Sequence, residues 1–147
     1  MATQPQSDDV TIGWALSRAQ RRELLAQFEP AYPDVVADHV TLKTKASETA
    51  PLPDARVGEI IGRVDDERGV EAMVVKIDGA TDRPGGGVYH ITWSLDDGRE
   101  AVESNDVIAR LGWASLPEPI PVVLEPARTR SSGPRWIVER GLSEHSA

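Results

Sequence analysis

The sequence has no cysteine among its 147 residues. This absence excludes disulfide frameworks, cysteine-ligated zinc, iron–sulfur clusters and thiol nucleophiles from the chemistry of these residues. Aromatic residues are also scarce, with one Phe, two Tyr and four Trp. The core must therefore be built mainly from Val, Ile, Leu and Ala, and against that background the four Trp are conspicuous.

Basic residues are fewer than acidic ones, since the sequence has 16 Lys and Arg and 24 Asp and Glu. The formal net charge is therefore -8. A wide basic surface for extended duplex nucleic acid is not expected, whereas a site for a nucleotide or a nucleic-acid end needs only a few local cations. Long apolar runs are absent too, since nothing approaches the roughly 18 residues of a membrane span and the first ten residues do not resemble a signal peptide. We expect a cytoplasmic protein that does not bind membranes.

The length and the pattern of apolar residues predict a single α+β domain. We expect this domain over residues 9–127, with a flexible segment at residues 1–8 and a polar, partly ordered tail at residues 128–147. Strands are predicted over residues 10–16, 35–43, 56–64, 70–77, 88–95 and 119–125, the last at a sheet edge because of its prolines. Helices are predicted over residues 18–28, after an N-cap at Ser17, and over a short stretch that a cap at Ser104 or Asn105 begins and Leu111 ends.

Two of the predicted strands carry the same short pattern, a histidine and a threonine separated by one apolar residue. The pattern reads HVTL over residues 39–42 and HITW over residues 90–93. Alternate side chains of a strand lie on the same face, so each histidine shares a face with its threonine while the apolar residues point to the core. Each strand therefore offers one imidazole and one hydroxyl to the same surface.

If the two strands lie near one another, His39, Thr41, His90 and Thr92 converge on a single groove. One imidazole can then take a proton from water while the other protonates a departing sugar oxygen, and the hydroxyls can donate to the phosphate oxygens. We therefore predict hydrolysis of a phosphodiester, with His90 as general base and His39 as general acid. A single strand of this kind usually holds a structural histidine, whereas the duplication favours a shared catalytic site. Two histidines without paired carboxylates at helical spacing predict no metal site, and no other cofactor is expected.

Three further residues are candidate substrate contacts. Lys43 shares the strand face of His39, and Lys45 follows two positions later; solvation of the strand end is the alternative interpretation for both. Trp14 lies in the first strand, where its indole could stack on a nucleobase, although core packing competes with this role. The glycine-rich segment 78–87 lacks the spacing of a phosphate-binding loop and is interpreted as a turn.

The paired strands resemble the signature of the two-histidine (2H) phosphoesterase superfamily. The segment HITWSLDDGREAVESNDVIARL, residues 90–111, is most similar to the cyclic phosphodiesterase domain of fungal-type tRNA ligases, and DHVTLK at residues 38–43 is also similar to that domain. The resemblance covers approximately residues 10–125. It implies a two-lobed sheet domain with a central groove and flanking helices, each lobe contributing one of the histidine strands. It also implies metal-independent hydrolysis of a 2′,3′-cyclic phosphate to a 2′-phosphate.

Two other functions stay open at this point. A phosphodiesterase for cyclic oligonucleotide signals would use the same four residues in a larger groove. A non-catalytic module that binds an RNA end or a nucleotide would keep the geometry without turnover, but it has no need for two proton-transfer groups. We expect a monomer whose partner is the 2′,3′-cyclic phosphate end of an RNA, or a cyclic nucleotide, in RNA repair or processing.

Overall fold

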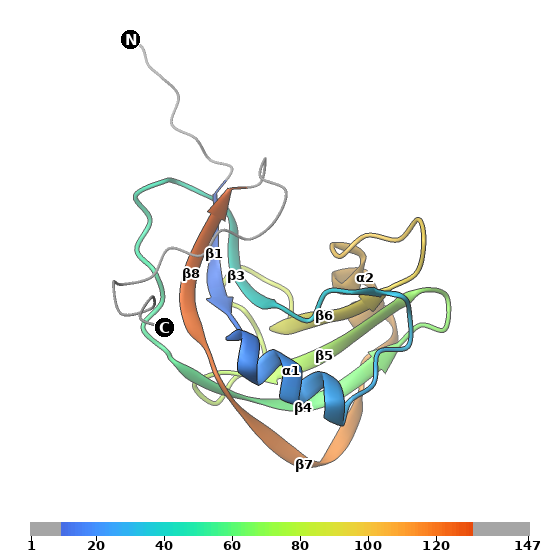
Figure 1. Ribbon diagram of the computed structural model, residues 1–147. Coiled ribbons are helices and arrows are strands. Elements are labelled where there is room, and N and C mark those ends of the chain that lie inside the picture. Colours follow the sequence, from blue (N-terminus) through green and yellow to red (C-terminus); the bar gives the residue numbers. More distant parts are fainter. Residues whose placement is uncertain (1–9, 131–147) are drawn as a thin grey trace.

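A computed structural model describes residues 10–130 of the chain (Figure 1). These residues form two antiparallel sheets and two helices, which confirms the α+β class. The predicted flexible segment at residues 1–8 and most of the predicted tail lie outside the described residues. The last strand reaches Arg130, so the sheet extends three residues past the domain boundary expected at residue 127.

The smaller sheet has three strands in the order β3-β1-β8. Its members are β1 (Val10–Ala15), β3 (His39–Ala46) and β8 (Glu125–Arg130). Gly13 of β1 pairs with Thr41 of β3, and a Cβ atom at Gly13 would lie 2.1 Å from the carbonyl oxygen of Val40. Glycine is therefore required for this close approach of the two backbones, which places the first histidine strand.

The larger sheet has five strands in the order β2-β6-β5-β4-β7. Its members are β2 (Asp34–Val35), β4 (Val57–Asp65), β5 (Val70–Lys76), β6 (His90–Leu95) and β7 (Ala114–Val123). Strands β4 and β5 form the predicted hairpin. Strand β7 lies at the edge of the sheet, as its prolines predicted. It covers Ala114–Val123, whereas the predicted strand covered residues 119–125. After β7 the chain continues as β8 in the other sheet.

Helix α1 (Arg18–Gln27) begins as predicted, because the Ser17 hydroxyl accepts a hydrogen bond of 3.1 Å from the backbone N–H of Gln20. Helix α2 (Glu103–Leu111) differs from its prediction. Val102 occupies the N-cap position without a side-chain hydrogen bond, and Ser104 is buried inside the first turn. The predicted cap at Ser104 or Asn105 is therefore wrong, because the Ser104 hydroxyl bonds to a side chain of the sheet instead.

One apolar core joins the two sheets and helix α1. It contains Trp14, Leu24, Val40, Ile91 and Trp93, all buried. The alternation predicted for the two histidine strands is confirmed on this side, since the apolar residues between and after the histidines face the core. The histidines lie on the opposite faces of their strands.

The predicted strand at residues 35–43 is in fact two strands in different sheets. After β2, the N–H groups of Val36 and Ala37 still donate to carbonyls of β6, over 3.0 and 2.9 Å. Ala37 then adopts φ 44°, and the chain crosses to the smaller sheet, where β3 begins at His39. This crossing brings β3 next to β6 (Figure 1).

Candidate active site

The two predicted histidines come together where the sheets meet. His39 is the first residue of β3 and His90 is the first residue of β6, and these strands contact one another although they belong to different sheets. The rings are near enough that a positive charge on His39 lowers the pKa of His90. Both side chains are half-buried. The structure therefore brings the two histidine strands together, and their catalytic role stays a prediction.

Both imidazole rings are anchored through the same nitrogen. Nδ1 of His90 lies 2.8 Å from the carbonyl oxygen of Val88, and Nδ1 of His39 lies 2.5 Å from a carboxylate oxygen of Asp38. A carbonyl and an ionised carboxylate only accept hydrogen bonds, so each Nδ1 carries the proton. Proton transfer at either ring would consequently run through Nε2.

His90 has an environment that favours the neutral ring. Burial lowers the pKa of His90 from its ordinary value of 6.5, and the charges of Arg83 and His39 lower it further, against an opposing effect of the Val88 carbonyl. The ring is therefore neutral at pH 7, with an unprotonated Nε2 that can accept a proton. This is the state that a general base needs.

The two threonines of the pattern are not equivalent. Thr41 is half-buried, and its hydroxyl makes no hydrogen bond with any residue in the 10–130 range that the structure describes. Thr92 is only 5% exposed, and its hydroxyl lies 2.9 Å from the Ser104 hydroxyl and 3.3 Å from the carbonyl oxygen of Ala101. A hydroxyl has one proton, so Thr92 would have to give up the bond that it donates, to the Ala101 carbonyl or to the Ser104 hydroxyl, before it could donate to a phosphate. Its present role is to join β6 to α2.

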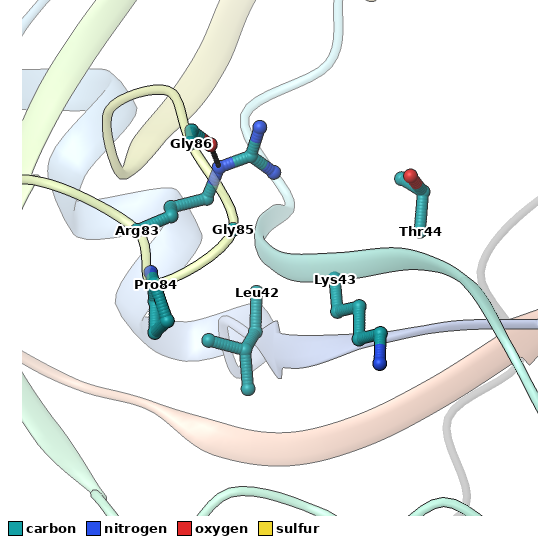
Figure 2. Close-up of a pocket in the computed structure, with 7 residues that line it drawn as sticks. All are labelled: Leu42, Lys43, Thr44, Arg83, Pro84, Gly85 and Gly86. Atoms are coloured by element: carbon teal, nitrogen blue, oxygen red, sulfur yellow. Dashed lines mark hydrogen bonds between the residues drawn. The ribbon is translucent and has the colours of Figure 1, made fainter.

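A cavity of about 520 Å³ opens on the face of β3. Residues 42–44 of β3 form one wall, and residues 83–86 of the loop between β5 and β6 form the other (Figure 2). The loop has a defined shape, because the N–H of Arg83 donates to Gly87 and its Nε donates to Gly86, over 2.9 and 3.0 Å. The segment interpreted as a simple turn is therefore one wall of a cavity.

The three candidate substrate contacts have different places. Lys43 is exposed and lines the cavity, as Figure 2 shows. Lys45 is exposed but does not line it; its φ of 55° interrupts the strand alternation on which the prediction of a shared face depended. Trp14 is 2% exposed, its indole N–H donates to the Ala55 carbonyl over 2.8 Å, and its ring meets Tyr89 edge-on at 5.7 Å. Trp14 therefore packs the core and offers no open ring face to a base.

Two residues of the site were missed from the sequence, Asp38 and Arg83. Asp38 directly precedes His39 in the DHVTLK segment, and a carboxylate beside a candidate proton donor was the available signal. Arg83 stands beside three consecutive glycines in an acidic chain, but the proximity of that loop to β3 comes from the fold alone. Neither position follows from strand periodicity.

Comparisons with models of known families, with curated proteins and with solved structures found no match. No helix between residues 10 and 130 is long and apolar enough to span a membrane. Within the same range, the His, Asp and Glu side chains form no group of three that could hold a metal ion. The geometry of the site and the residues that carry the resemblance are therefore what indicate a function.

Proposed function

We propose that this protein is a cyclic phosphodiesterase that hydrolyses a 2′,3′-cyclic phosphate to a 2′-phosphate by acid–base catalysis from two histidines. The observation that carries the proposal is the pair His39 and His90, which lie close together at the starts of two strands of different sheets. Hydrolysis of a phosphodiester by water needs one group that accepts a proton and another that gives one to the leaving oxygen. Two imidazoles that each act through Nε2 meet this need without a metal ion.

The proposed reaction is a single displacement at phosphorus. A water molecule attacks the phosphorus atom of the cyclic phosphate while Nε2 of His90 takes one proton from it. The bond between phosphorus and O3′ breaks, and Nε2 of His39 gives its proton to the departing oxygen. The products are a 2′-phosphomonoester and a free 3′-hydroxyl, with His90 protonated and His39 neutral. Proton exchange with solvent restores both rings.

The surroundings of the two rings support this assignment of roles. The lowered pKa of His90 keeps it neutral at pH 7, as a base requires. The carboxylate of Asp38 balances a positive charge on His39, which suits the acid. The Thr41 hydroxyl can donate to a phosphoryl oxygen as negative charge develops there. The choice of a 2′,3′-cyclic end, and of the bond that breaks, comes from the resemblance to the 2H superfamily.

The purified protein tests this proposal when it is incubated in EDTA with 2′,3′-cyclic AMP, with an RNA that ends in a cyclic phosphate, and with a cyclic dinucleotide. We expect hydrolysis of one or both cyclic-phosphate substrates to 2′-phosphates. His39→Ala and His90→Ala should each lower kcat/KM by roughly 10²–10⁴-fold. His145→Ala removes the third histidine and should leave the rate unchanged.

Three results would contradict the proposal. Near wild-type rates in both His39→Ala and His90→Ala would remove these rings from the reaction. A loss of activity in EDTA that zinc or manganese restores would replace the two-imidazole mechanism by a metal-assisted one. Turnover of the cyclic dinucleotide alone would favour the cyclic-oligonucleotide alternative.

A further inference from the structure

The cavity between β3 and the loop that precedes β6 concentrates positive charge in an acidic protein. Lys43 and Arg83 line it from opposite walls, and no Asp or Glu lines it, although the whole chain has a net charge of -8. Neither cation forms a salt bridge with another residue of the described chain, 10–130. Two unpaired cations on one concave surface indicate a site for an anionic ligand.

We propose that this cavity binds the nucleotide that precedes the cyclic phosphate, so that the substrate is an RNA end of at least two nucleotides. Lys43 and Arg83 would contact the phosphodiester that joins the last two nucleotides. The inference depends on the proposed function, because it assumes that the cyclic phosphate lies at the histidine pair. It selects the RNA end over the free cyclic mononucleotide as the substrate class.

The order of residues along β3 supports this arrangement. His39 begins the strand, and Thr41 and Lys43 follow it. The pairing with β1 shifts register between the last two, because Gly13 pairs with Thr41 and Ile12 with Lys43, so a bulge at Leu42 separates them. A substrate strand that runs along β3 from a cyclic phosphate at His39 and Thr41 would bring its preceding phosphodiester toward Lys43.

Arg83 connects the cavity to the reaction centre from the other wall. Its charge acts on His90, and its side chain is fixed by the hydrogen bond to Gly86 (Figure 2). A preformed guanidinium whose charge acts on the base is well placed to bind a phosphate oxygen of the same substrate strand. An anion bound there would also offset the positive charge that Arg83 presents to His90.

The size and lining of the cavity suit one nucleotide. Its volume of about 520 Å³ is within the range of roughly 300–1,000 Å³ that is typical of small-ligand sites. Leu42 and Pro84 supply apolar surface for a sugar or a base, while a Cβ atom at Gly85 or Gly86 would meet no other atom within 4 Å. The glycine wall is thus open toward a ligand, although the N–H of Gly86 already donates to the Arg83 carbonyl over 3.0 Å.

The test compares two substrates, 2′,3′-cyclic AMP and the dinucleotide ApA with a terminal 2′,3′-cyclic phosphate. The wild-type kcat/KM should be at least about 10-fold higher for the dinucleotide, as expected for hydrogen bonds to a charged group. Lys43→Gln and Arg83→Gln should each reduce this ratio by roughly 10-fold. Arg22→Gln removes the same charge from an exposed position on α1 and should leave the ratio unchanged.

The ratio of the two substrates is the appropriate readout because the loss of Arg83 also changes His90. Removing that positive charge raises the pKa of His90 and alters turnover of both substrates alike. Lys43 is exposed, so Lys43→Gln provides a second variant with little risk to folding. Thermal unfolding of all three variants checks that the fold is retained.

The outcomes separate this inference from the proposed function. Equal kcat/KM for the two substrates, or ratios unchanged in both cavity variants, would overturn the subsite while leaving the histidine mechanism standing. If neither substrate is hydrolysed, the proposed function fails, and binding of the same dinucleotide by calorimetry decides the subsite. Binding that weakens in Arg83→Gln but not in Arg22→Gln would support it, and absence of binding would overturn it.

Discussion

His39 and His90 occupy equivalent positions at the starts of β3 and β6, yet their neighbours differ. The carboxylate of Asp38 contacts one ring, whereas a backbone carbonyl and the charge of Arg83 act on the other. Two identical side chains can thereby take opposite parts in a proton transfer. The sequence pattern predicted the pair, but the pattern itself contains no residue that distinguishes the two rings, because the partners of each ring come from outside it.

The pH dependence of kcat/KM follows from these surroundings. If His90 must be neutral, activity is lost as the pH falls through the pKa of His90, and because that pKa is lowered, the acid limb should lie below pH 6.5. In Arg83→Gln the pKa of His90 rises, so the acid limb should move to higher pH. Profiles of kcat/KM over about pH 5 to 9 measure the acid limb of the wild type and that of Arg83→Gln. The apparent pKa values belong to the coupled pair of histidines.

Arg22→Gln is the control for this shift, since it changes the net charge equally at an exposed position on α1. Its acid limb should coincide with that of the wild type. An acid limb above pH 6.5 in the wild type, or one that Arg83→Gln leaves in place, would contradict the assignment of His90 as base.

The two threonines should respond differently to the same substitution. Thr41→Ala should change the free energy of unfolding by no more than about 0.5 kcal/mol, because the Thr41 hydroxyl has no partner among residues 10–130. It should lower kcat by up to roughly 10²–10³-fold, because a hydrogen-bond donor to the phosphoryl group is lost. Thr92→Ala leaves the buried Ser104 hydroxyl without its nearest partner and should cost about 1–3 kcal/mol of stability. Urea unfolding and kcat, measured on both variants, check this division.

A Thr92→Ser variant keeps the hydroxyl and should recover most of the stability. If Thr92→Ala proves as stable as the wild type, the hydrogen bond between Thr92 and Ser104 does not contribute to the free energy of unfolding. If Thr41→Ala keeps full kcat, the Thr41 hydroxyl takes no part in the reaction.

At the scale of elements, period-2 alternation located the strands well but could not detect the place where the chain changes sheets. Residues 35–43 form one continuous β-branched pattern in the sequence, and the structure divides it at Ala37 and Asp38. The division depends on a positive φ at Ala37 and on pairing with strands far away in the chain. Local strand propensity predicts neither of these features. The misplaced cap of α2 has the same origin, because a tertiary contact of Ser104 replaces the local one.

Arg21 of α1 supports this crossing. Its guanidinium donates to the carbonyls of Val36 and Ala37 over distances of 3.1–3.3 Å, at the point where the chain leaves β6. Arg21→Met should leave these carbonyls unpaired, cost about 1–3 kcal/mol of unfolding free energy, and lower kcat by displacing His39. Chemical unfolding and steady-state kinetics measure the two effects.

Arg18→Met provides the matched control for Arg21→Met. It removes a charge from an exposed position in the first turn of the same helix, where the structure gives the guanidinium no hydrogen bond within the described chain. It should leave stability and kcat near the wild-type values. Equal losses in the two variants would mean that Arg21 acts through net charge and not through the crossing.

At the scale of the whole molecule, the residue pattern predicted the class of fold and the two histidine strands, whereas their proximity was expected from the duplication and the resemblance and not from strand periodicity. The contact between β3 and β6 joins different sheets, so it depends on how the sheets pack around the core that Trp14 and Trp93 share. The cavity was beyond prediction for the same reason, since its two walls are separated by about forty residues of chain. Net charge was informative at this scale alone, because the excess of acidic residues predicts against an extended basic surface.

That balance of charge predicts how binding depends on salt and on RNA length. An end-binding site that contacts one cyclic phosphate and one phosphodiester releases few counterions, so the affinity should fall with log salt at a slope of roughly -1 to -2. Affinity should rise between one and two nucleotides and then stay level up to about eight nucleotides, because a net charge of -8 predicts no basic track beyond the cavity.

Binding of cyclic-phosphate oligonucleotides to His39→Ala, measured at two salt concentrations, tests this expectation without turnover. Arg22→Gln in the same background controls for net charge and should leave the slope unchanged, whereas Arg83→Gln should make it shallower by about one phosphate contact, or roughly 0.7. A slope steeper than about -4, with affinity that keeps growing with length, would require many phosphate contacts outside the cavity. That result would favour a module that binds along an RNA strand over an enzyme that processes its end.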